Sequence, residues 1–441
     1  MCYAIPGLVE EIENNLAIID YFGEKRKAYN ELEHLSPGDF VYAQGGFVIK
    51  KIPPEEAQSI LSTWKETFFE LQEVDLRLSR LQLERKATSN DLLRILDKVL
   101  EEKTLSQKEA LFLLNLEDEK ERELLYKTAN FLRRKYLGNS CCVHGIIEFS
   151  NFCSRNCSYC GISIHNRKLK RYRMSDEEII QTAIQAIDQY GFQALVLQSG
   201  EDPCFPAKRL AELIKELKRQ RPVLIFVSCG EVGERGLEIL YQAGARGILM
   251  RFETSNPVLY EKLHPGYSLE ERIQHLKIAY QIGYLIITGA LIGLPGQSDE
   301  DLLNDIFLTS ELRAEMCSFG PFLPHPETPL GHSRPPNKTR VLNALALIRI
   351  LAPKHSKILV TTAFETLDPL ARENGLMAGA NSLMLNVTPA HFRKQYVIYP
   401  HRAHEKESLE DQIKQTLQLL YKLGRAPTDL GTEITNGENK A

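Results

Sequence analysis

The pattern of apolar and polar positions changes twice along the chain, and its first stretch predicts short β-strands. Apolar residues gather in short runs at positions 8–12, 16–20 and 39–43. Turn-forming residues separate these runs, namely Asn14, Asn15, Gly23, Pro37 and Gly38. Because a short all-β unit buries its apolar face best by closing on itself, residues 1–62 are expected to form a small β-barrel.

The second stretch has the apolar spacing of helices. Pro53 and Pro54 suit the first turn of a helix, where a missing N–H costs nothing. Asn90 and Ser106 are placed to begin further helices, and Gly138 is placed to end the last one. Residues 63–138 are therefore interpreted as a solvated helical connector whose last helices pack on the domain that follows.

The third stretch alternates apolar runs with amphipathic segments. Strands are predicted at 143–149, 194–198, 223–228, 247–252, 285–291, 318–322, 358–362 and 382–387. Helices between them include residues 176–190, 207–219 and 269–280. This rhythm predicts the α/β class, with a (β/α)8 TIM-type barrel over residues 139–425 and its active site at the carboxyl ends of the strands. The polar, aperiodic segment 426–441 is expected to be a disordered tail.

Composition narrows the class of protein. The 441 residues are 43% hydrophobic and 25% charged, which is typical of a globular chain. The 54 basic and 58 acidic residues give a net charge of −4, so no basic field suggests nucleic acid as a partner. No apolar run approaches the roughly 20 residues of a membrane helix, and the first residues do not resemble a signal peptide. A cytoplasmic protein is expected.

The nine cysteines indicate a metal site more than a disulfide framework. Directly after the first predicted barrel strand, Cys153, Cys157 and Cys160 form a C-x3-C-x2-C pattern. Three thiolates on one loop can hold three irons of a cubane cluster and leave the fourth iron open for a small molecule. The alternative is a zinc site in which His165 is the fourth ligand.

This pattern, with Tyr159 as the aromatic residue before the last cysteine, resembles the radical S-adenosylmethionine (SAM) superfamily. Within it, the chain is most similar to the HydE-type maturases of FeFe-hydrogenase. The motifs that carry this similarity are residues 153–160, 169–174, 197–203, 251–257, 293–297, 320–326, 361–363 and 386–389. The resemblance implies a 4Fe-4S cluster that cleaves SAM reductively to a 5′-deoxyadenosyl radical, which attacks a substrate deeper in the barrel.

Several residues at predicted strand ends are candidates for cofactor binding. Glycine at position 200 allows a ligand to approach the backbone closely, and charges at the end of the fourth strand need a ligand or each other. The resemblance implies that SAM contacts Tyr159, Ser199, Gly200, Glu201, Asp202, Arg251, Glu253, Arg272 and Gly293. The alternative for the pair at 251 and 253 is a structural ion pair. Candidates for the substrate wall are Thr361, Thr362, Tyr396 and Tyr399.

The chain begins with Met1–Gly7, and two further short motifs follow at Gly38–Val41 and Gly46–Ile49. Through these motifs the first 62 residues resemble the HypC/HupF chaperones of NiFe-hydrogenase maturation. In that family the second residue is the working cysteine, which makes Cys2 a candidate metal ligand. The chaperones usually have histidine where this chain has Gln44, and a neutral amide is a poor iron ligand. With glutamine at position 44, the module is therefore expected to keep the ability to dock to a partner protein more readily than the ability to bind iron.

The leading hypothesis is a radical SAM maturase of hydrogenase metallocofactors fused to a docking module. Expected partners are hydrogenase maturation proteins (a scaffold, or HypD- or HypE-like proteins), an electron donor such as ferredoxin or flavodoxin, and a small-molecule or small iron-complex substrate. No cysteine follows Cys317, so the second cluster of some family members is not expected. The alternatives are an enzyme similar to methylornithine synthase and a non-catalytic assembly chaperone. The barrel resembles maturases of FeFe-hydrogenase, whereas the first 62 residues resemble chaperones of NiFe-hydrogenase. The sequence therefore does not decide which of the two hydrogenases the protein helps to mature.

Overall fold

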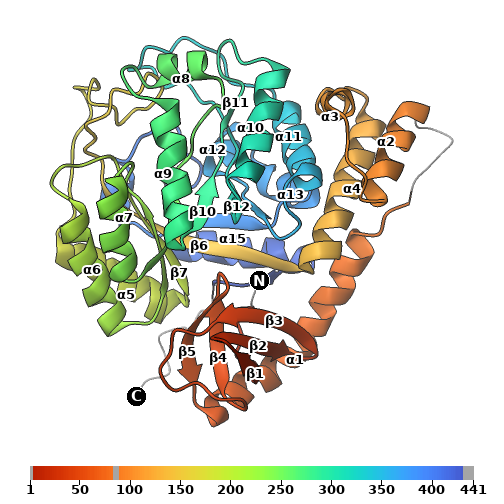
Figure 1. Cartoon of the computed structure of the whole chain (residues 1–441), viewed down its shortest axis with the longest axis vertical. Coiled ribbons are helices and arrows are strands. Elements are labelled where there is room, and N and C mark those ends of the chain that lie inside the picture. Colours follow the sequence, from red (N-terminus) through yellow and green to blue (C-terminus); the bar gives the residue numbers. More distant parts are fainter. Residues whose placement is uncertain (1–2, 83–88, 431–441) are drawn as a thin grey trace.

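The computed structural model describes residues 3–82 and 89–430, and these form three parts. A small β-barrel lies beneath a larger α/β barrel, and a group of helices runs along one side of both (Figure 1). Cys2, the candidate ligand of the first part, lies outside the described residues.

The small β-barrel confirms the fold expected for the first residues. Its strands are β1 (Gly7–Glu13), β2 (Leu16–Tyr21), β3 (Glu24–Tyr29), β4 (Phe40–Gln44) and β5 (Phe47–Ile52). They close in the order β1-β2-β3-β5-β4. The three predicted runs are β1, β2 and β4. The run that became β3 was not recognised because its residues are mostly charged and only Ala28 faces the core fully.

The helical part is α1 (Pro54–Leu78), α2 (Asn90–Leu100), α3 (Gln107–Leu114) and α4 (Glu119–Leu137). Ser106 and Glu109 form a capping box at α3, and Gly138 ends α4 with a positive φ. Trp64 and Phe68 of α1 belong to the core of the small barrel. The boundary placed between residues 62 and 63 therefore falls inside one continuous helix. As expected, α3 and α4 pack on the large barrel, where they contact α11 (Lys338–Leu351).

The large barrel confirms the (β/α)8 prediction. Its parallel strands follow the order β14-β12-β10-β9-β8-β7-β6-β15, and a parallel bridge between Leu359 and Ser382 joins the two ends. The strands are β6 (Ser140–Ser150), β7 (Ala194–Ser199), β8 (Leu224–Ser228), β9 (Ala245–Leu249), β10 (Leu285–Thr288), β12 (Met316–Cys317), β14 (Lys357–Ile358) and β15 (Ser382–Asn386). A short pair, β11 (Leu291–Ile292) and β13 (Gly320–Pro321), extends beyond the rim.

Helices cover the outside of this barrel (Figure 1). They are α5 (Asp176–Tyr190), α6 (Ala207–Gln220), α7 (Gly233–Gln242), α8 (Pro257–Leu263), α9 (Leu269–Ile282), α10 (Asp299–Glu311), α11 (Lys338–Leu351), α12 (Thr362–Leu367), α13 (Ala371–Met377), α14 (Ala390–Arg393) and α15 (Leu409–Lys422). The strand expected at 358–362 is shorter than predicted, because Thr361 caps α12 with its side chain.

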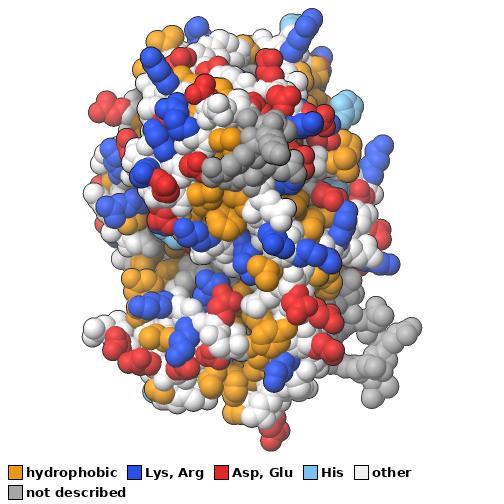
Figure 2. Space-filling view, turned by 90° about the vertical axis from the view of Figure 1, so that its right-hand side faces the viewer, with side chains coloured by type: hydrophobic (Ala, Val, Ile, Leu, Met, Phe, Trp, Pro, Cys, Tyr) orange, Lys and Arg blue, Asp and Glu red, His pale blue; other side chains and the backbone are white. Residues whose placement is uncertain are grey.

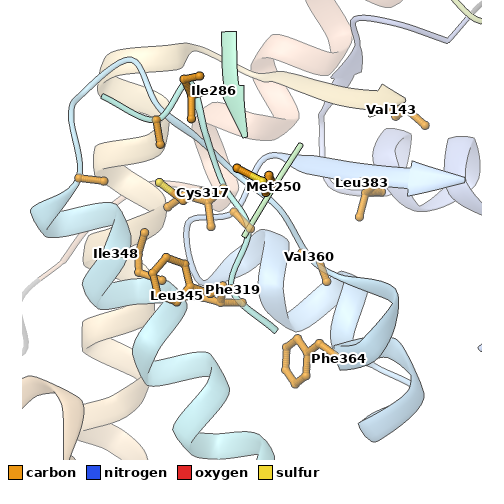
Figure 3. Close-up of a cluster of buried hydrophobic side chains, with 14 of the residues drawn as sticks. Val143, Met250, Ile286, Cys317, Phe319, Leu345, Ile348, Val360, Phe364 and Leu383 are labelled. Atoms are coloured by element: carbon orange, nitrogen blue, oxygen red, sulfur yellow. The ribbon is translucent and has the colours of Figure 1, made fainter. Parts of the chain in front are cut away.

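The apolar core lies between the strands and these helices. In Figure 3, Leu345 and Ile348 of α11 lie beside Cys317 of β12 and Phe319, which follows that strand. All four side chains are at most 1% exposed. Burying each such side chain contributes about 1.5–3 kcal/mol, so this layer holds the outer helices on the barrel.

The expectation of a disordered tail from residue 426 is wrong for its first residues. Strand β16 (Ala426–Pro427) pairs with the beginning of β6, and Leu430 is fully buried. Ala426 and Leu430 are buried together with Thr428 and Asp429, whose side chains hydrogen-bond to each other. This stretch is too short to show the apolar periodicity from which a strand or helix is predicted. Residues 431–441 lie outside the described residues.

The surface agrees with the small net charge. On the face shown in Figure 2, lysine and arginine side chains are intermixed with aspartate and glutamate side chains. Within residues 3–82 and 89–430, no helix combines the length and apolar character that crossing a membrane requires.

A buried ion pair joins the connector helices. Asp75 of α1 accepts two hydrogen bonds from Arg133 of α4, at 2.6 and 2.9 Å, and both side chains are at most 1% exposed. Replacing Asp75 with Asn leaves the Arg133 guanidinium buried without its counter-charge. We expect Asp75→Asn to lower the free energy of unfolding by about 3–5 kcal/mol, measured by urea denaturation.

The pair of Asp188 with Arg221 supplies the matched control. It has the same chemistry, but its side chains are 44% and 41% exposed. Asp188→Asn should change stability by no more than about 1 kcal/mol. Equal effects of the two substitutions would contradict the role assigned to the buried pair.

Candidate functional site

The cysteine loop follows β6 and is held by polar side chains on both of its flanks. Asn151 donates to the carbonyl oxygens of Lys170 and Gln395 at 2.9 and 2.8 Å. The Arg171 guanidinium donates to the carbonyl oxygens of Ile162 and Ser163 at 2.8 and 2.7 Å. These bonds fix the loop although it has no regular secondary structure.

All three predicted cluster cysteines line one cavity at the carboxyl ends of the strands, with a volume of about 240 Å³. None of the cysteines in the described part of the chain forms a disulfide. Burial raises the pKa of Cys160 to about 12 and also raises those of Cys153 and Cys157. Buried thiols of this kind become thiolates only when a bound cation compensates their charge, so the donor set fits a metal cluster.

The structure does not support the zinc alternative with His165, because that side chain is exposed. The imidazole near the cysteines is that of His264, whose Nδ1 lies 3.2 Å from the Sγ of Cys157. Burial lowers the pKa of His264 well below its usual value, which keeps the ring neutral. His264 had no signal in the sequence, because it follows α8 rather than a strand.

A network of two arginines and two glutamates forms one wall of the cavity. Arg155 binds Glu201 through its Nε and Glu231 through its Nη2, the latter at 3.1 Å, and Arg272 binds Glu231 through its Nε. Burial opposes ionisation of Glu231, but the adjacent Arg272 and Arg155 outweigh it and hold its pKa below the usual range.

Glu201 and Arg272 of this network were predicted from sequence, whereas Arg155 and Glu231 were missed. Glu231 lies three positions after the end of β8, so the rule that catalytic side chains follow barrel strands contained the signal. Arg155 lies within the cysteine motif itself, between Cys153 and Cys157, and the spacing of the cysteines gives no signal for it.

A second polar group also lines the cavity. Glu253 accepts from the Tyr159 hydroxyl at 3.0 Å and pairs with Arg251 at 3.1 Å. Its backbone has a φ of +68°, an uncommon conformation for a residue other than glycine. The Oε2 atom of Glu253 is buried without a hydrogen-bond partner among the described residues. The ion pair that was the structural alternative is therefore present, yet it lines the cavity and leaves one acceptor atom open.

Gly200 is required where the second strand meets the cysteine loop. A Cβ atom at this position would lie 2.3 Å from the carbonyl oxygen of Phe152 and 2.6 Å from the Cβ of Cys153. The neighbouring Ser199 and Glu201 also line the cavity. Glycine thus lets the loop lie directly against the end of β7.

Asp202, predicted in the same motif, is directed away from the cavity. Its carboxylate binds Arg173 at 2.7 Å and accepts from the Ser150 hydroxyl at 2.6 Å. Glu201 lines the cavity, whereas Asp202 is not among the residues that line it. Asp202 is a positioning residue for the end of β6.

The remaining predicted residues divide between the cavity and its surroundings. Tyr396 and Tyr399 line the cavity. Gly293 is not among the residues that line it and lies in a turn held by Gln297. Thr361 caps α12, and Thr362 lines a smaller neighbouring cavity that also contains Arg402.

The arrangement combines a three-thiol metal site, a paired set of charges for a zwitterionic ligand, and an aromatic wall. The open Oε2 atom of Glu253 suits an ammonium or hydroxyl donor, and Arg155 and Arg272 suit a carboxylate. A site of this kind can hold a metal cluster beside an amino-acid-like ligand.

Comparisons with known proteins agree with this geometry. The profile of the radical SAM superfamily matches residues 147–308, and that of the HupF/HypC family matches residues 1–64. The chain is 41% identical to the [FeFe] hydrogenase maturase subunit HydE of Thermotoga maritima, over 71% of this chain and 89% of the relative. It is 30% identical to 3-methylornithine synthase of Methanosarcina acetivorans, over 78% of this chain and 96% of that protein. The crystal structure of methylornithine synthase (PylB) superposes with a TM-score of 0.66 at 27% identity, covering 76% of this chain and 97% of that one.

The charge network predicts a pH-dependent contribution of Glu231 to stability. Its pKa is lower in the folded chain than the roughly 4.3 of an unfolded glutamate, so its contribution is complete above that value and is lost as the pH falls further. We expect Glu231→Gln to cost about 2 kcal/mol at neutral pH, measured by urea denaturation. The difference from the parent protein should shrink below about pH 4.

Glu234→Gln is the control, because Glu234 is exposed three positions away. This variant should unfold like the parent protein at every pH. A constant difference between Glu231→Gln and the parent protein across the acid range would contradict the assignment.

Proposed function

The chain belongs to the HydE-type radical SAM maturases, and from this premise we propose that it modifies a small iron-containing or amino-acid-derived substrate during hydrogenase maturation. The observation that carries the proposal is the convergence of Cys153, Cys157 and Cys160 on one cavity that Tyr396 and Tyr399 also line. The chain is a radical SAM enzyme with a HupF/HypC-like domain at its N-terminus.

The three cysteines hold a 4Fe-4S cluster, and SAM is the second cofactor. When bound, such a cluster supplies the electron that cleaves SAM reductively. The roles of the surrounding residues follow from their chemistry. Arg155 and Arg272 are placed to bind a carboxylate, Glu253 is placed to accept from a donor through its open Oε2, and Gly200 keeps the cysteine loop against β7.

A buried hydrogen-bond network beside Tyr396 and Tyr399 supports the assignment of these two residues to the substrate side of the cavity. Arg402 forms two hydrogen bonds with the fully buried Glu148, at 2.6 and 3.1 Å, and its guanidinium lies 6.0 Å from the Tyr399 ring. Asn386 donates to the same carboxylate at 2.7 Å. These bonds fix the aromatic wall, so a substrate held against it would meet rigid rather than mobile side chains.

The environment of Gln44 favours a role of the N-terminal module in docking to partner proteins over a role in carrying a metal ion. Gln44 is fully buried and donates to Gln193 of the large barrel at 2.8 Å. A residue that faces the barrel in this way is not free to present a metal ion to another protein. The partners that we expect at the outer surface of the module are hydrogenase maturation proteins, and the expected electron donor is ferredoxin or flavodoxin. The cysteines of the described residues form no disulfide, which agrees with a cytoplasmic setting.

Methylornithine synthase remains the useful comparison for substrate choice. The 30% identity to that enzyme is lower than the 41% to HydE, and a HupF/HypC-like domain belongs to a hydrogenase context. The hydrogenase assignment therefore takes precedence, and formation of 3-methylornithine is the outcome that would favour the alternative.

Loss of a cluster cysteine should abolish SAM cleavage. We expect anaerobically reconstituted Cys157→Ala to form 5′-deoxyadenosine more slowly than the parent protein by more than about 100-fold, which is the upper end of the cost of losing an outer-shell partner alone. The product is quantified by chromatography after addition of a low-potential reductant. Cys204→Ala is the matched control, because Cys204 is exposed and is not among the residues that line the cavity. A Cys157→Ala protein that retains iron and activity would overturn the cluster assignment.

A maturation assay separates the proposed function from SAM cleavage itself. Cells that lack their own HydE-type maturase are supplied with this chain, and the activities of FeFe- and NiFe-hydrogenase are measured. Recovery of one activity by the parent protein and not by Cys157→Ala is expected. If neither hydrogenase recovers while the protein cleaves SAM, the proposed role in maturation is wrong.

A further inference from the structure

Three polar side chains meet at the floor of the large barrel, at the opposite end from the cysteine loop. Cys142 and His144 lie two positions apart on β6, so both side chains point into the barrel. Asp429 comes from the segment that follows β16, and the pairing of β16 with β6 brings it under the barrel. Each of the three side chains is at most 3% exposed.

The distances suit a single ion. One ligand atom from each residue lies within 4.8 Å of the others, and the Nε2 of His144 is 3.4 Å from the Oδ2 of Asp429. Ligand atoms around one tetrahedral ion are roughly 3.4–3.8 Å apart, given bond lengths of about 2.0–2.3 Å. The cavity beside these atoms has a volume of about 10 Å³, which is enough for about one ion or one water molecule.

The small barrel covers this cavity. The turn between β4 and β5 reaches the barrel floor, where a Cβ atom on Gly45 would lie 2.6 Å from Leu224. Gln44 also lines the cavity, and its Oε1 atom is buried without a hydrogen-bond partner among the described residues. An unpartnered buried oxygen beside a thiol, an imidazole and a carboxylate is an independent indication that a ligand belongs there.

The charges at the floor are consistent with a cation. Two carboxylates, Asp429 and Glu315, line the cavity together with one lysine, Lys357. Lys357 pairs with Glu315, and Asp429 lies beside the His144 imidazole, so the floor carries a net negative charge when that imidazole is neutral and suits a cation. The Thr428 hydroxyl donates to the Asp429 carboxylate at 2.6 Å, as outer-shell groups commonly do for ligating carboxylates.

We propose that Cys142, His144 and Asp429 bind one divalent transition-metal ion of borderline softness, such as Zn²⁺ or Fe²⁺, beneath the Gln44–Gly45 turn of the small barrel. A thiolate, an imidazole and a carboxylate are the mixed ligand set that these ions accept. The fourth position faces the turn. The ion ties together β6, the C-terminal segment and the N-terminal module.

Cobalt(II) is the probe, because a cobalt–thiolate bond gives a charge-transfer band that no oxygen or nitrogen ligand produces. The titration uses full-length C153A/C157A/C160A protein, so the result does not depend on the radical SAM site or on the proposed function. We expect one equivalent of Co²⁺ to bind and to give the thiolate band. Adding Cys142→Ser should remove the band and weaken binding by at least about 10-fold.

Cys141→Ser is the matched control. Cys141 is also fully buried, but it points to the outer face of β6, so its variant should keep both the band and the stoichiometry. His144→Gln retains the thiol and should weaken binding without removing the band, which keeps the test decisive if Cys142→Ser does not fold. Sub-stoichiometric binding, or a band that survives Cys142→Ser, would overturn the proposal. So would a diffraction map without an anomalous peak that shows a water molecule beside a His144–Asp429 pair.

Discussion

The alternation of side chains along β6 is the constraint on which the rest of the structure depends. This strand pairs with β7, β15 and β16, and its carboxyl end continues into the cysteine loop. Its inward positions carry Cys142 and His144 at the floor and Glu148 near the carboxyl end. Because successive residues point to opposite faces, a shift of one residue would place apolar side chains in the cavity and polar groups in the outer core. Pairing on both sides and at both ends prevents that shift.

Charge compensation is the second constraint, and it acts at the rim of the barrel. A cluster loop and an amino-acid-like cofactor need charged partners, yet each of these charges is costly to bury. The chain meets this requirement by pairing Arg155 and Arg272 with Glu231 and Glu201, so the cavity wall is nearly neutral before a ligand arrives. A ligand with both charges can exchange partners within this network, whereas a ligand with a single charge would leave one residue unpaired. The network therefore favours zwitterionic ligands by the same ion pairs that stabilise it.

What the sequence could predict depends on how far apart the interacting residues are. The cysteines were predicted from their short C-x3-C-x2-C motif, and Gly200 was predicted because it follows the end of a predicted strand. Arg155 meets Glu231 across 76 positions, and no local pattern encodes such a pairing. Local sequence also did not predict which way neighbouring side chains point. Glu201 lines the cavity, whereas the adjacent Asp202 binds Arg173 instead. In the same way His165, which is close to the cysteines in sequence, is exposed, whereas His264 contacts Cys157.

The two halves of the chain make physical sense together only when their contact is considered. A free chaperone of the HupF/HypC kind presents its surface to partners, but here the turn at Gln44 and Gly45 is pressed against the floor of the large barrel. The residue that replaces histidine is buried by the fusion, so the loss of a metal-binding side chain at position 44 removes a group that could no longer reach solvent. At this position Gln44 instead contacts the large barrel through its hydrogen bond to Gln193. The polar groups that remain beneath the turn, on β6 and after β16, are the ones that can still hold a ligand at this junction.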